Sequence, residues 1–427
     1  IKINDPYKPT PNKHLWKRAA TVKPLNTYRI ALSQLGDRKI FLQTANISDD
    51  ETEFEVAYTQ SKFISAGRAT GRIARTLDAV LPDSIKVFKI TNLNGDSAMS
   101  SIEIPRVAIA RYESGNNTEL LKRKVQIDEK TYRRDQYKYV PDSTLPKNLS
   151  KITPSIRSQV GGPDGFYFGE LAIAYHSEFV IRKNLTLSTV ASIGIIDNFD
   201  NLKLASDSVL PHVRTDIVKY LKNSRKGYIK HSNLTWFQQP YKNIYTKLSG
   251  GILEEMFSGV GGEVLYRDSF SNFGIGAELY WVQQRDYRML SGLKDYKTVT
   301  GHINLFYEEP RSNIVFSVKG GRFLAKDSGF NVDIARKWST GMRMGIFFAK
   351  TDISEQEFGE GSFDKGFYFS IPIESLFGKY QRGMTPFGLR PIQRDGAASL
   401  HTQFPLWAVT DWKSSRTIFD TWDDFYD

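Results

Sequence analysis

The stretch that decides the fold of this protein runs from residue 272 to residue 350 and begins NFGIGAELYW. In residues 273–281 apolar side chains occupy every second position, and glycine, glutamate and tyrosine lie between them. Side chains alternate between the two faces of a β-strand, so this run predicts a strand with one apolar and one polar face. The alternation returns in residues 298–307, 314–319, 330–335 and 342–348. Such runs in tandem, joined by short turn-rich or charged connections, predict an antiparallel meander.

Two all-β architectures show this pattern. In a soluble sandwich the apolar faces point inward, whereas in an outer-membrane β-barrel they face lipid and the polar faces line the interior. Barrel strands are about ten residues long and carry aromatic residues near their ends. The runs have that length, and aromatic residues such as Phe273, Trp281 and Tyr307 mark their ends. The pattern therefore favours a transmembrane barrel, with the sandwich as the alternative.

The composition suits strands that are polar on one side. The 427 residues are 40% hydrophobic, include 27 phenylalanines and 21 tyrosines, and contain no cysteine for a disulfide or a thiolate metal site. No run of about 18 apolar residues is present, so we expect no transmembrane helix. The net charge of +11 suggests an anionic partner such as lipopolysaccharide, acidic polysaccharide or nucleic acid. Because the sequence begins at Ile1, with neither a Met nor a signal sequence, we expect a processed chain or a piece of a longer one.

The chain divides into five parts in this interpretation. They are an extended N-terminal segment (1–24), a small α+β module (25–113), a polar connector (114–163), the strand array (164–400) and a C-terminal tail (401–427). In the module, a helix is predicted to begin after Ser65, a residue type that caps helices, and to end before Pro82. The connector is basic, but no helix of basic residues interleaved with stacking aromatic residues follows, so we expect a solvated linker and no nucleic-acid partner.

The array holds about thirteen predicted strands, among them weaker candidates such as residues 213–222 and 384–392. Single-chain bacterial barrels generally have an even number of strands. An open sheet in a membrane would also leave two unpaired edges in lipid, where each unsatisfied backbone group costs several kcal/mol. We therefore expect about 12–13 strands that either close on themselves or form part of a larger barrel completed by a second segment.

Several motifs of the array resemble those of one family. They are GGEVLYR (261–267), GIGAEL (274–279), QRDY (284–287), DYKTVTGH (295–302), GGRFLAKD (320–327), EFGEGSFDKG (357–366) and RPIQRDGA (390–397). They resemble the YjbH-like (GfcD-like) exopolysaccharide and capsule biosynthesis proteins. The resemblance covers roughly residues 165–407 well and the N-terminal module more loosely.

The resemblance implies an outer-membrane β-barrel protein of a Gram-negative bacterium, with a periplasmic module, that takes part in export or assembly of an exopolysaccharide or capsule. Proteins of this family carry two strand arrays and are usually lipoproteins, so this chain would be the C-terminal half of a barrel of about 26 strands. The implied partners are outer-membrane lipid and lipopolysaccharide, a second barrel half from the same or another chain, other polysaccharide-export envelope proteins, and the polysaccharide. The family brings no agreed catalytic residues.

Polar residues on the wet faces of the strands are the first candidate site. They are Glu278, Tyr280, His302, Lys319, Asp333, Lys337 and Arg343. Mixed charges and tyrosine on a pore wall can hydrate and guide a sugar chain. Ordinary polar positions of a barrel interior explain each of them equally well.

An acidic loop formed by Glu357, Glu360 and Asp364 is the second candidate site. Such a loop could bind a cation or a sugar, supply two glycosidase carboxylates, or be a tight surface turn. A glycosidase needs carboxylates on rigid supports, which this glycine-rich loop does not provide.

The six histidines show no metal-pair spacing, although His302 could take part in a Ser-His dyad. We therefore predict no catalytic residue, no cofactor and no metal. An outer-membrane enzyme acting on glycan or lipid and a soluble β-rich carbohydrate-binding protein are the alternatives.

Overall fold

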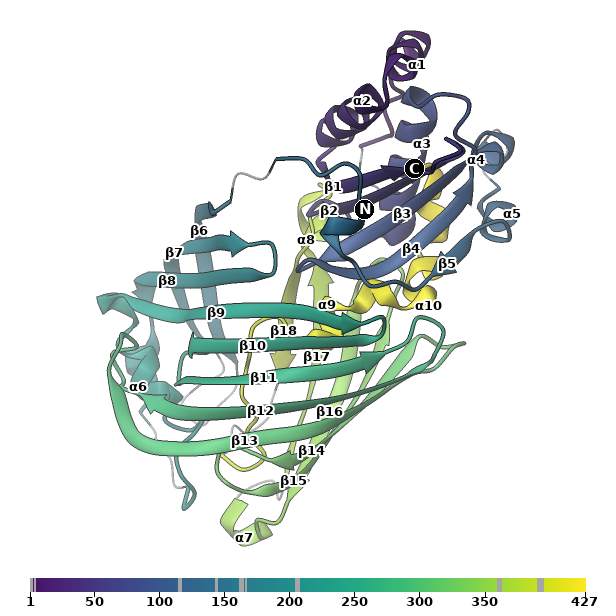
Figure 1. Ribbon diagram of the computed structural model, residues 1–427. Helices are drawn as coiled ribbons and strands as arrows, with labels where there is room; N and C mark the ends of the chain where they lie inside the picture. Colours follow the sequence, from purple (N-terminus) through teal and green to yellow (C-terminus); the bar gives the residue numbers. More distant parts are fainter. Residues whose placement is uncertain are drawn as a thin grey trace.

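The computed structural model describes residue 3 and residues 5–113, 117–142, 145–160, 165, 167–203, 208–358, 363–389 and 395–427. These residues form two sheets, a five-stranded sheet in an N-terminal module and a thirteen-stranded sheet that follows it (Figure 1). Within the same ranges, no helix has the length and apolar character needed to span a membrane.

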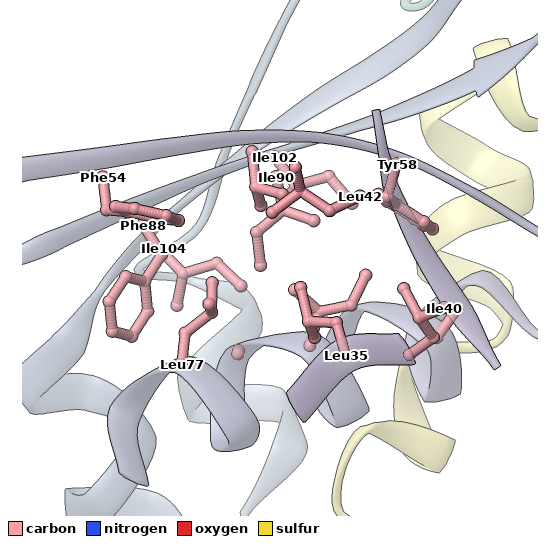
Figure 2. Packing of buried hydrophobic residues seen from close by; sticks show 14 of the residues in the cluster. Leu35, Ile40, Leu42, Phe54, Tyr58, Leu77, Phe88, Ile90, Ile102 and Ile104 are labelled. Carbon is pink, nitrogen blue, oxygen red and sulfur yellow. The ribbon is translucent and has the colours of Figure 1, made fainter. Parts of the chain in front are cut away.

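The N-terminal module packs helices against its own sheet. Its elements are α1 (Lys13–Val22), α2 (Pro24–Gly36), β1 (Ile40–Ile47), β2 (Glu53–Gln60), α3 (Ala66–Val80), β3 (Val87–Asn94), β4 (Ser97–Pro105), α4 (Arg106–Glu113), α5 (Thr118–Lys122) and β5 (Gln126–Asp128). The predicted cap of α3 is confirmed, because the Ser65 hydroxyl accepts a hydrogen bond of 3.1 Å from the Arg68 N–H. Figure 2 shows Leu35 of α2 and Leu77 of α3 pointing toward the sheet residues Phe88 and Ile90, and all four side chains are buried.

The large sheet is an antiparallel meander, as the alternation predicts. Its strands are β6 (Lys147–Val160), β7 (Tyr167–Arg182), β8 (Leu185–Asp197), β9 (Tyr228–Tyr241), β10 (Ile244–Ile252), β11 (Phe257–Arg267), β12 (Phe273–Arg285), β13 (Leu293–Glu308), β14 (Ile314–Arg322), β15 (Ser328–Lys337), β16 (Arg343–Thr351), β17 (Asp364–Pro372) and β18 (Met384–Leu389). Each strand pairs with its neighbours in chain order, and β6 and β18 are the two edges of the sheet in the described residues.

The apolar face of this sheet points outward. On β12, Ile275 and Leu279 are 49% and 63% exposed, whereas Tyr280 on the opposite face is 2% exposed. On β13, Ile303 is 60% exposed while Thr300 is buried. A sandwich would bury the apolar set and expose the polar one. The sandwich alternative is therefore wrong for this sheet.

Three segments fold differently from the prediction. The N-terminal segment (1–24), predicted to be extended, contains the helix α1. The predicted connector contains both β5 and the edge strand β6, whose alternation is weak and interrupted by Pro154, a residue that sheets tolerate at an edge. The predicted strand at residues 213–222 is wrong, because this segment contains the short helix α6 (Ile217–Leu221) in the connection between β8 and β9. There Tyr220 and Leu221 are buried in small clusters at the end of the sheet instead of pairing with a strand.

The predicted C-terminal tail is folded and packs on the module. It contains α9 (Leu406–Val409), α10 (Ser415–Asp420) and the 3-10 helix η5 (Trp422–Tyr426). Trp422 and Phe425 are completely buried in the module core, where η5 lies against α3. Gly67 and Gly71 permit this close approach, because a Cβ atom at either position would overlap a backbone carbonyl of the tail. Burial of these apolar side chains against α3 stabilises the folded tail.

Candidate functional site

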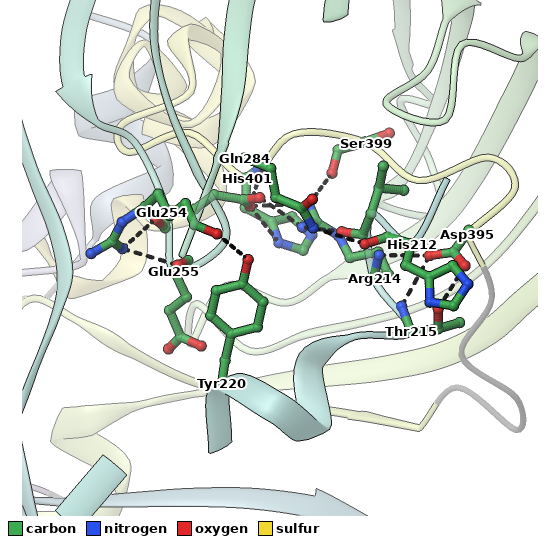
Figure 3. Close-up of polar contacts among 12 residues, drawn as sticks. His212, Arg214, Thr215, Tyr220, Glu254, Glu255, Gln284, Asp395, Ser399 and His401 are labelled. Atoms are coloured by element: carbon green, nitrogen blue, oxygen red, sulfur yellow. Dashed lines mark hydrogen bonds and ion pairs between the residues drawn. The ribbon is translucent and has the colours of Figure 1, made fainter. Parts of the chain in front are cut away.

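A C-terminal segment crosses the polar inner face of the large sheet from one end to the other. We call residues 395–414 the strap. Figure 3 shows its first anchor, at the end of the sheet farther from the module. Arg214 pairs with Glu254 at 2.6 Å and donates to the Ser399 carbonyl at 2.6 Å. The Asp395 carboxylate accepts from the Arg214 N–H at 2.7 Å and from the Thr215 hydroxyl at 2.7 Å.

Glu254 is the buried centre of this first anchor and lies in the turn between β10 and β11. Its carboxylate also accepts from the His401 backbone N–H at 3.0 Å. Burial alone would raise the pKa of Glu254, but the Arg214 guanidinium and His401 outweigh burial and lower this pKa to about 2. The ionised carboxylate therefore ties the strap to the sheet at neutral pH.

The second anchor is a buried ion pair between two neighbouring strands. Lys247 of β10 has a fully buried side chain and pairs with Glu263 of β11. The Lys247 ammonium donates to the carbonyls of Gln403 and Phe404 at 3.0 and 3.2 Å. The Glu263 carboxylate accepts from the Leu406 N–H at 2.9 Å. Each member of the pair thus holds the strap backbone as well as its partner.

Trp407 forms the third anchor. Its ring stacks on Phe306 of β13 with centroids 4.1 Å apart and planes 4° apart. The guanidinium carbon of Arg267 lies 3.7 Å from the ring centroid, and Arg267 pairs with Glu308 at 2.5 Å. Gly274 of β12 leaves room for the indole, because a Cβ there would lie 2.5 Å from the ring.

The strap ends on the module. At the module end of the sheet, Lys337 of β15 pairs with Asp411 of the strap at 2.6 Å. Lys413 of the strap pairs with Glu129, in the segment after β5, at 3.3 Å. Within the described residues, five basic–acidic pairs therefore hold the strap or its docking points: Arg214–Glu254, Lys247–Glu263, Arg267–Glu308, Lys337–Asp411 and Lys413–Glu129.

Beside the strap lies a cavity of about 330 Å³, which we call the polar groove. Residues of seven consecutive strands, β11 to β17, line it together with residues 405–408 of the strap. So many successive strands can line one cavity only because the sheet curls around it, as Figure 1 shows. Among the predicted lumen residues, those that line the groove are Glu278, Lys319, Asp333 and Arg343.

The charged side chains of the groove are paired with one another. Glu278 bonds the Lys319 ammonium at 3.0 Å and the His302 Nδ1 at 2.8 Å. Asp333 accepts from Arg343 Nη2 and from the Tyr368 hydroxyl, each at 2.9 Å. A third carboxylate of the lining, Glu263, is paired with the buried Lys247, so the groove has little net charge.

A comparison with known protein families shows to which family the chain belongs. A family model described as exopolysaccharide biosynthesis protein YbjH matches residues 2–411. The chain belongs to the YjbH family. It is also 28% identical over 368 residues to the uncharacterized lipoprotein YjbH of Escherichia coli (strain K12), in a match that covers 83% of this chain and 52% of that relative. The chain therefore spans about half the length of the curated relative, and the resemblance inferred from the motifs is confirmed.

The other predicted lumen residues of this YjbH-family chain lie outside the groove. Tyr280 is 2% exposed and its hydroxyl lies 3.3 Å from a Glu263 oxygen. His302 is 4% exposed and packs against Phe323 with centroids 4.7 Å apart. Lys337 lines a second cavity of about 410 Å³ at the module end of the sheet. Tyr280 and His302 thus contact the groove-lining carboxylates Glu263 and Glu278 without lining the groove themselves.

A Ser-His dyad at His302 finds no support in the described part of the chain, where no serine bonds to this imidazole. A serine and a histidine do meet elsewhere, since Ser188 Oγ and His231 Nε2 are 3.3 Å apart. Both of these residues are buried and neither lines the groove.

The described residues of the predicted acidic loop lie in a helix and at the start of a strand, and residues 359–362 between them lie outside the described residues. Glu357 lies in the short helix α7 (Glu355–Phe358) and accepts from the Ser354 hydroxyl at 2.7 Å and the Ser354 N–H at 3.2 Å, as in a capping box. Asp364 is buried at the start of β17. Glu360 lies outside the described residues. No group of three or more His, Asp or Glu side chains within the described ranges is arranged to hold a metal ion.

Five polar groove residues are not among the predicted site residues: Glu263, Asn304, Ser317, Asn331 and Tyr368. The two asparagines share the inner face with Lys319, to which both pair in register, so the period-two pattern could have found them. The strap carries no comparable signal, because its contacts with the sheet are with residues 70 or more positions away.

Proposed function

We propose that this YjbH-family chain forms half of an outer-membrane β-barrel that takes part in the export or assembly of an exopolysaccharide or capsule, without catalysis of its own. The observation that carries the proposal is the outward apolar face of the large sheet. Ile195 of β8, Leu279 of β12 and Ile346 of β16 are 51%, 63% and 56% exposed, so the apolar surface extends over many strands. A surface of that extent needs a cover, and lipid covers it across all strands at once.

The two edges of the sheet support completion by a second array. Within the described residues β6 and β18 pair on one side only. Unpaired backbone groups in lipid cost several kcal/mol each, so an open sheet is not stable there. The relative YjbH of E. coli is about twice as long as the matched region, which supports a second array in the same protein. Two arrays of this size give about 26 strands, within the range of bacterial barrels.

The proposed location and partners follow from this arrangement. The E. coli relative is a lipoprotein, which supports a place in the cell envelope of a Gram-negative bacterium. The outer face would contact outer-membrane lipid and lipopolysaccharide. The module at one end of the sheet would lie in the periplasm and dock to other polysaccharide-export proteins (Figure 1). The polymer itself would meet the polar inner face.

The absence of catalysis is supported by the use of the acidic side chains. Glu278 and Asp333, two carboxylates of the predicted site, are each paired with a cation. Glu278 pairs with Lys319 two strands away, and Asp333 pairs with Arg343 of the adjacent strand. Glu357 caps α7. A paired-carboxylate hydrolase needs one acid that is free to protonate the leaving group and one free base or nucleophile.

Deletion of the gene in its own host tests the role, and fractionation of the full-length protein tests the location. We expect surface exopolysaccharide to fall and to return on complementation. We also expect the protein in the outer-membrane fraction, with a gel mobility that changes on heating as for folded barrels. Normal surface polymer in the deletion strain would contradict the role, and recovery of the protein in the soluble periplasmic fraction would contradict the barrel.

A further inference from the structure

We propose that the polar groove is a binding site for uncharged saccharide units. The inference rests on the proposed function and goes further, because it assigns a surface, a set of side chains and a chemical class of ligand. The side chains are Glu278, Asn304, Lys319, Asn331, Asp333 and Arg343, which all line the groove.

The strap covers only part of the inner face. It lies over parts of β10 to β13 through Lys247, Glu263 and Phe306. Anchors at both ends and in the middle, with Glu254 and Lys247 buried, hold it in place. Displacing the strap would leave several buried charges without their partners, so a ligand binds beside it. A polymer that meets the inner face beside the strap meets the groove side chains, from Glu278 on β12 to Tyr368 on β17.

The charge of the groove selects an uncharged ligand. Lys319 is neutralised by Glu278 at 3.0 Å, and Arg343 by Asp333 at 2.9 Å. Glu263, which also lines the groove, is neutralised by Lys247. An acidic sugar would need cations in excess, whereas the +11 net charge of the chain is not concentrated here.

The groove nevertheless keeps free hydrogen-bonding groups. In the described part of the chain the side-chain amides of Asn304 and Asn331 make no hydrogen bond. Asp333 accepts both of its hydrogen bonds on Oδ1, which leaves Oδ2 available. In a carboxylate–guanidinium pair the carboxylate can accept from one sugar hydroxyl while the guanidinium donates to the next. Free amides and such pairs match the neighbouring hydroxyls of an uncharged pyranose.

The second cavity extends the site toward the module. It has a volume of about 410 Å³ and shares Arg343, Trp407 and Ala408 with the polar groove. Trp338 adds an apolar surface to its lining. Both volumes lie in the range of about 300–1,000 Å³ that is typical of small-ligand sites. The two adjoining cavities give room for consecutive sugar units along the strap.

Saturation-transfer NMR and calorimetry on the full-length protein in detergent test the inference, with maltoheptaose and cellohexaose as uncharged probes and oligoguluronate as an acidic probe. We expect the uncharged probes to bind and the acidic one to bind more weakly. In the double variant Asp333→Asn and Arg343→Met, which removes charge from both partners together, we expect affinity for the uncharged probes to fall about tenfold. The matched control is Arg336→Met, on the outer face of β15, the strand that carries Asp333. This variant should bind as the wild type does.

Three results would overturn the assignment: no binding of either uncharged probe, unchanged affinity in the double variant, or tighter binding of oligoguluronate. A heat-modifiability assay on each variant shows that it is folded. Complementation of the deletion strain separates this inference from the proposed function. If the wild-type gene restores surface polymer and the groove assignment fails in binding, only the site is refuted. If deletion itself leaves the polymer unchanged, the function is refuted whatever the groove binds.

Discussion

The guanidinium carbon of Arg267 lies 3.7 Å from the ring centroid of Trp407, although the two residues are 140 positions apart in the chain. Arg267 also donates to the Trp407 carbonyl at 2.9 Å, so it holds the side chain and the backbone of the strap together. Cation–π contacts of desolvated groups contribute about 2 kcal/mol. The strap is thereby a fixed wall of the inner face, and its anchors can be tested one at a time.

Gly274→Ala should loosen the strap near Trp407. The new Cβ would lie 2.5 Å from the indole, and overpacking of this kind costs about 1–3 kcal/mol. Lys413, which is buried in the strap, should then be cleaved faster by trypsin, as mass spectrometry of the fragments would show. Gly320→Ala is the matched control, since its Cβ would meet nothing nearer than 3.9 Å. Equal cleavage rates in the two variants would show that Trp407 does not need the space above Gly274.

Lys247→Met should destabilise the protein strongly. The substitution leaves the Glu263 carboxylate without its buried partner and removes two hydrogen bonds to the strap, so we expect a loss of about 3–5 kcal/mol. Urea unfolding in detergent measures it, with Lys297→Met on an exposed position of β13 as the control. The double variant Lys247→Met and Glu263→Met should recover part of the loss. A single variant as stable as the control would mean that Glu263 finds another partner.

Gly71→Ala should separate the C-terminal tail from the module. A Cβ on this residue of α3 would overlap the Phe425 carbonyl, so η5 has to move away. Hydrogen exchange in residues 415–427 should become faster while the module strands keep their protection. Gly36→Ala, where the added Cβ meets nothing within 4 Å, should leave exchange unchanged. Unchanged exchange in Gly71→Ala as well would show that the tail adjusts without detaching.

Acid should weaken the first anchor of the strap. The pKa of Glu254 is lowered to about 2, so its contribution to stability is complete above the ordinary glutamate pKa and is lost as the pH falls through about 2. The full contribution is on the order of 3 kcal/mol. The stability difference between wild type and Glu254→Gln should narrow in urea titrations between pH 4.5 and pH 2. The exposed Glu355→Gln should show no such pH dependence, and a difference that stays constant would place the anchor elsewhere.

Part of the candidate site was accessible from the alternation alone. Glu278 on β12, Lys319 on β14 and Asp333 on β15 all fall on polar positions of period-two runs, and the structure brings them to one groove. Tyr280 obeys the same rule and is nevertheless buried behind the groove. A period of two assigns a face to a side chain, but whether that side chain is buried or lines a cavity depends on the curvature of the sheet and on what lies against it.

The amino-acid sequence by itself determined that the chain forms a long antiparallel sheet with one apolar and one polar face, because alternation is a local property of each strand. It also determined the helix capped by Ser65, since capping involves residues three positions apart. Only the tertiary structure decided that the apolar face points outward, that β6 belongs to the sheet, that residues 213–222 avoid it, and that the strap divides its inner face. The buried Lys247 ammonium is stable only when Glu263 and the Phe404 carbonyl lie beside it. Because Phe404 is far away in the chain, no local sequence pattern predicts this burial.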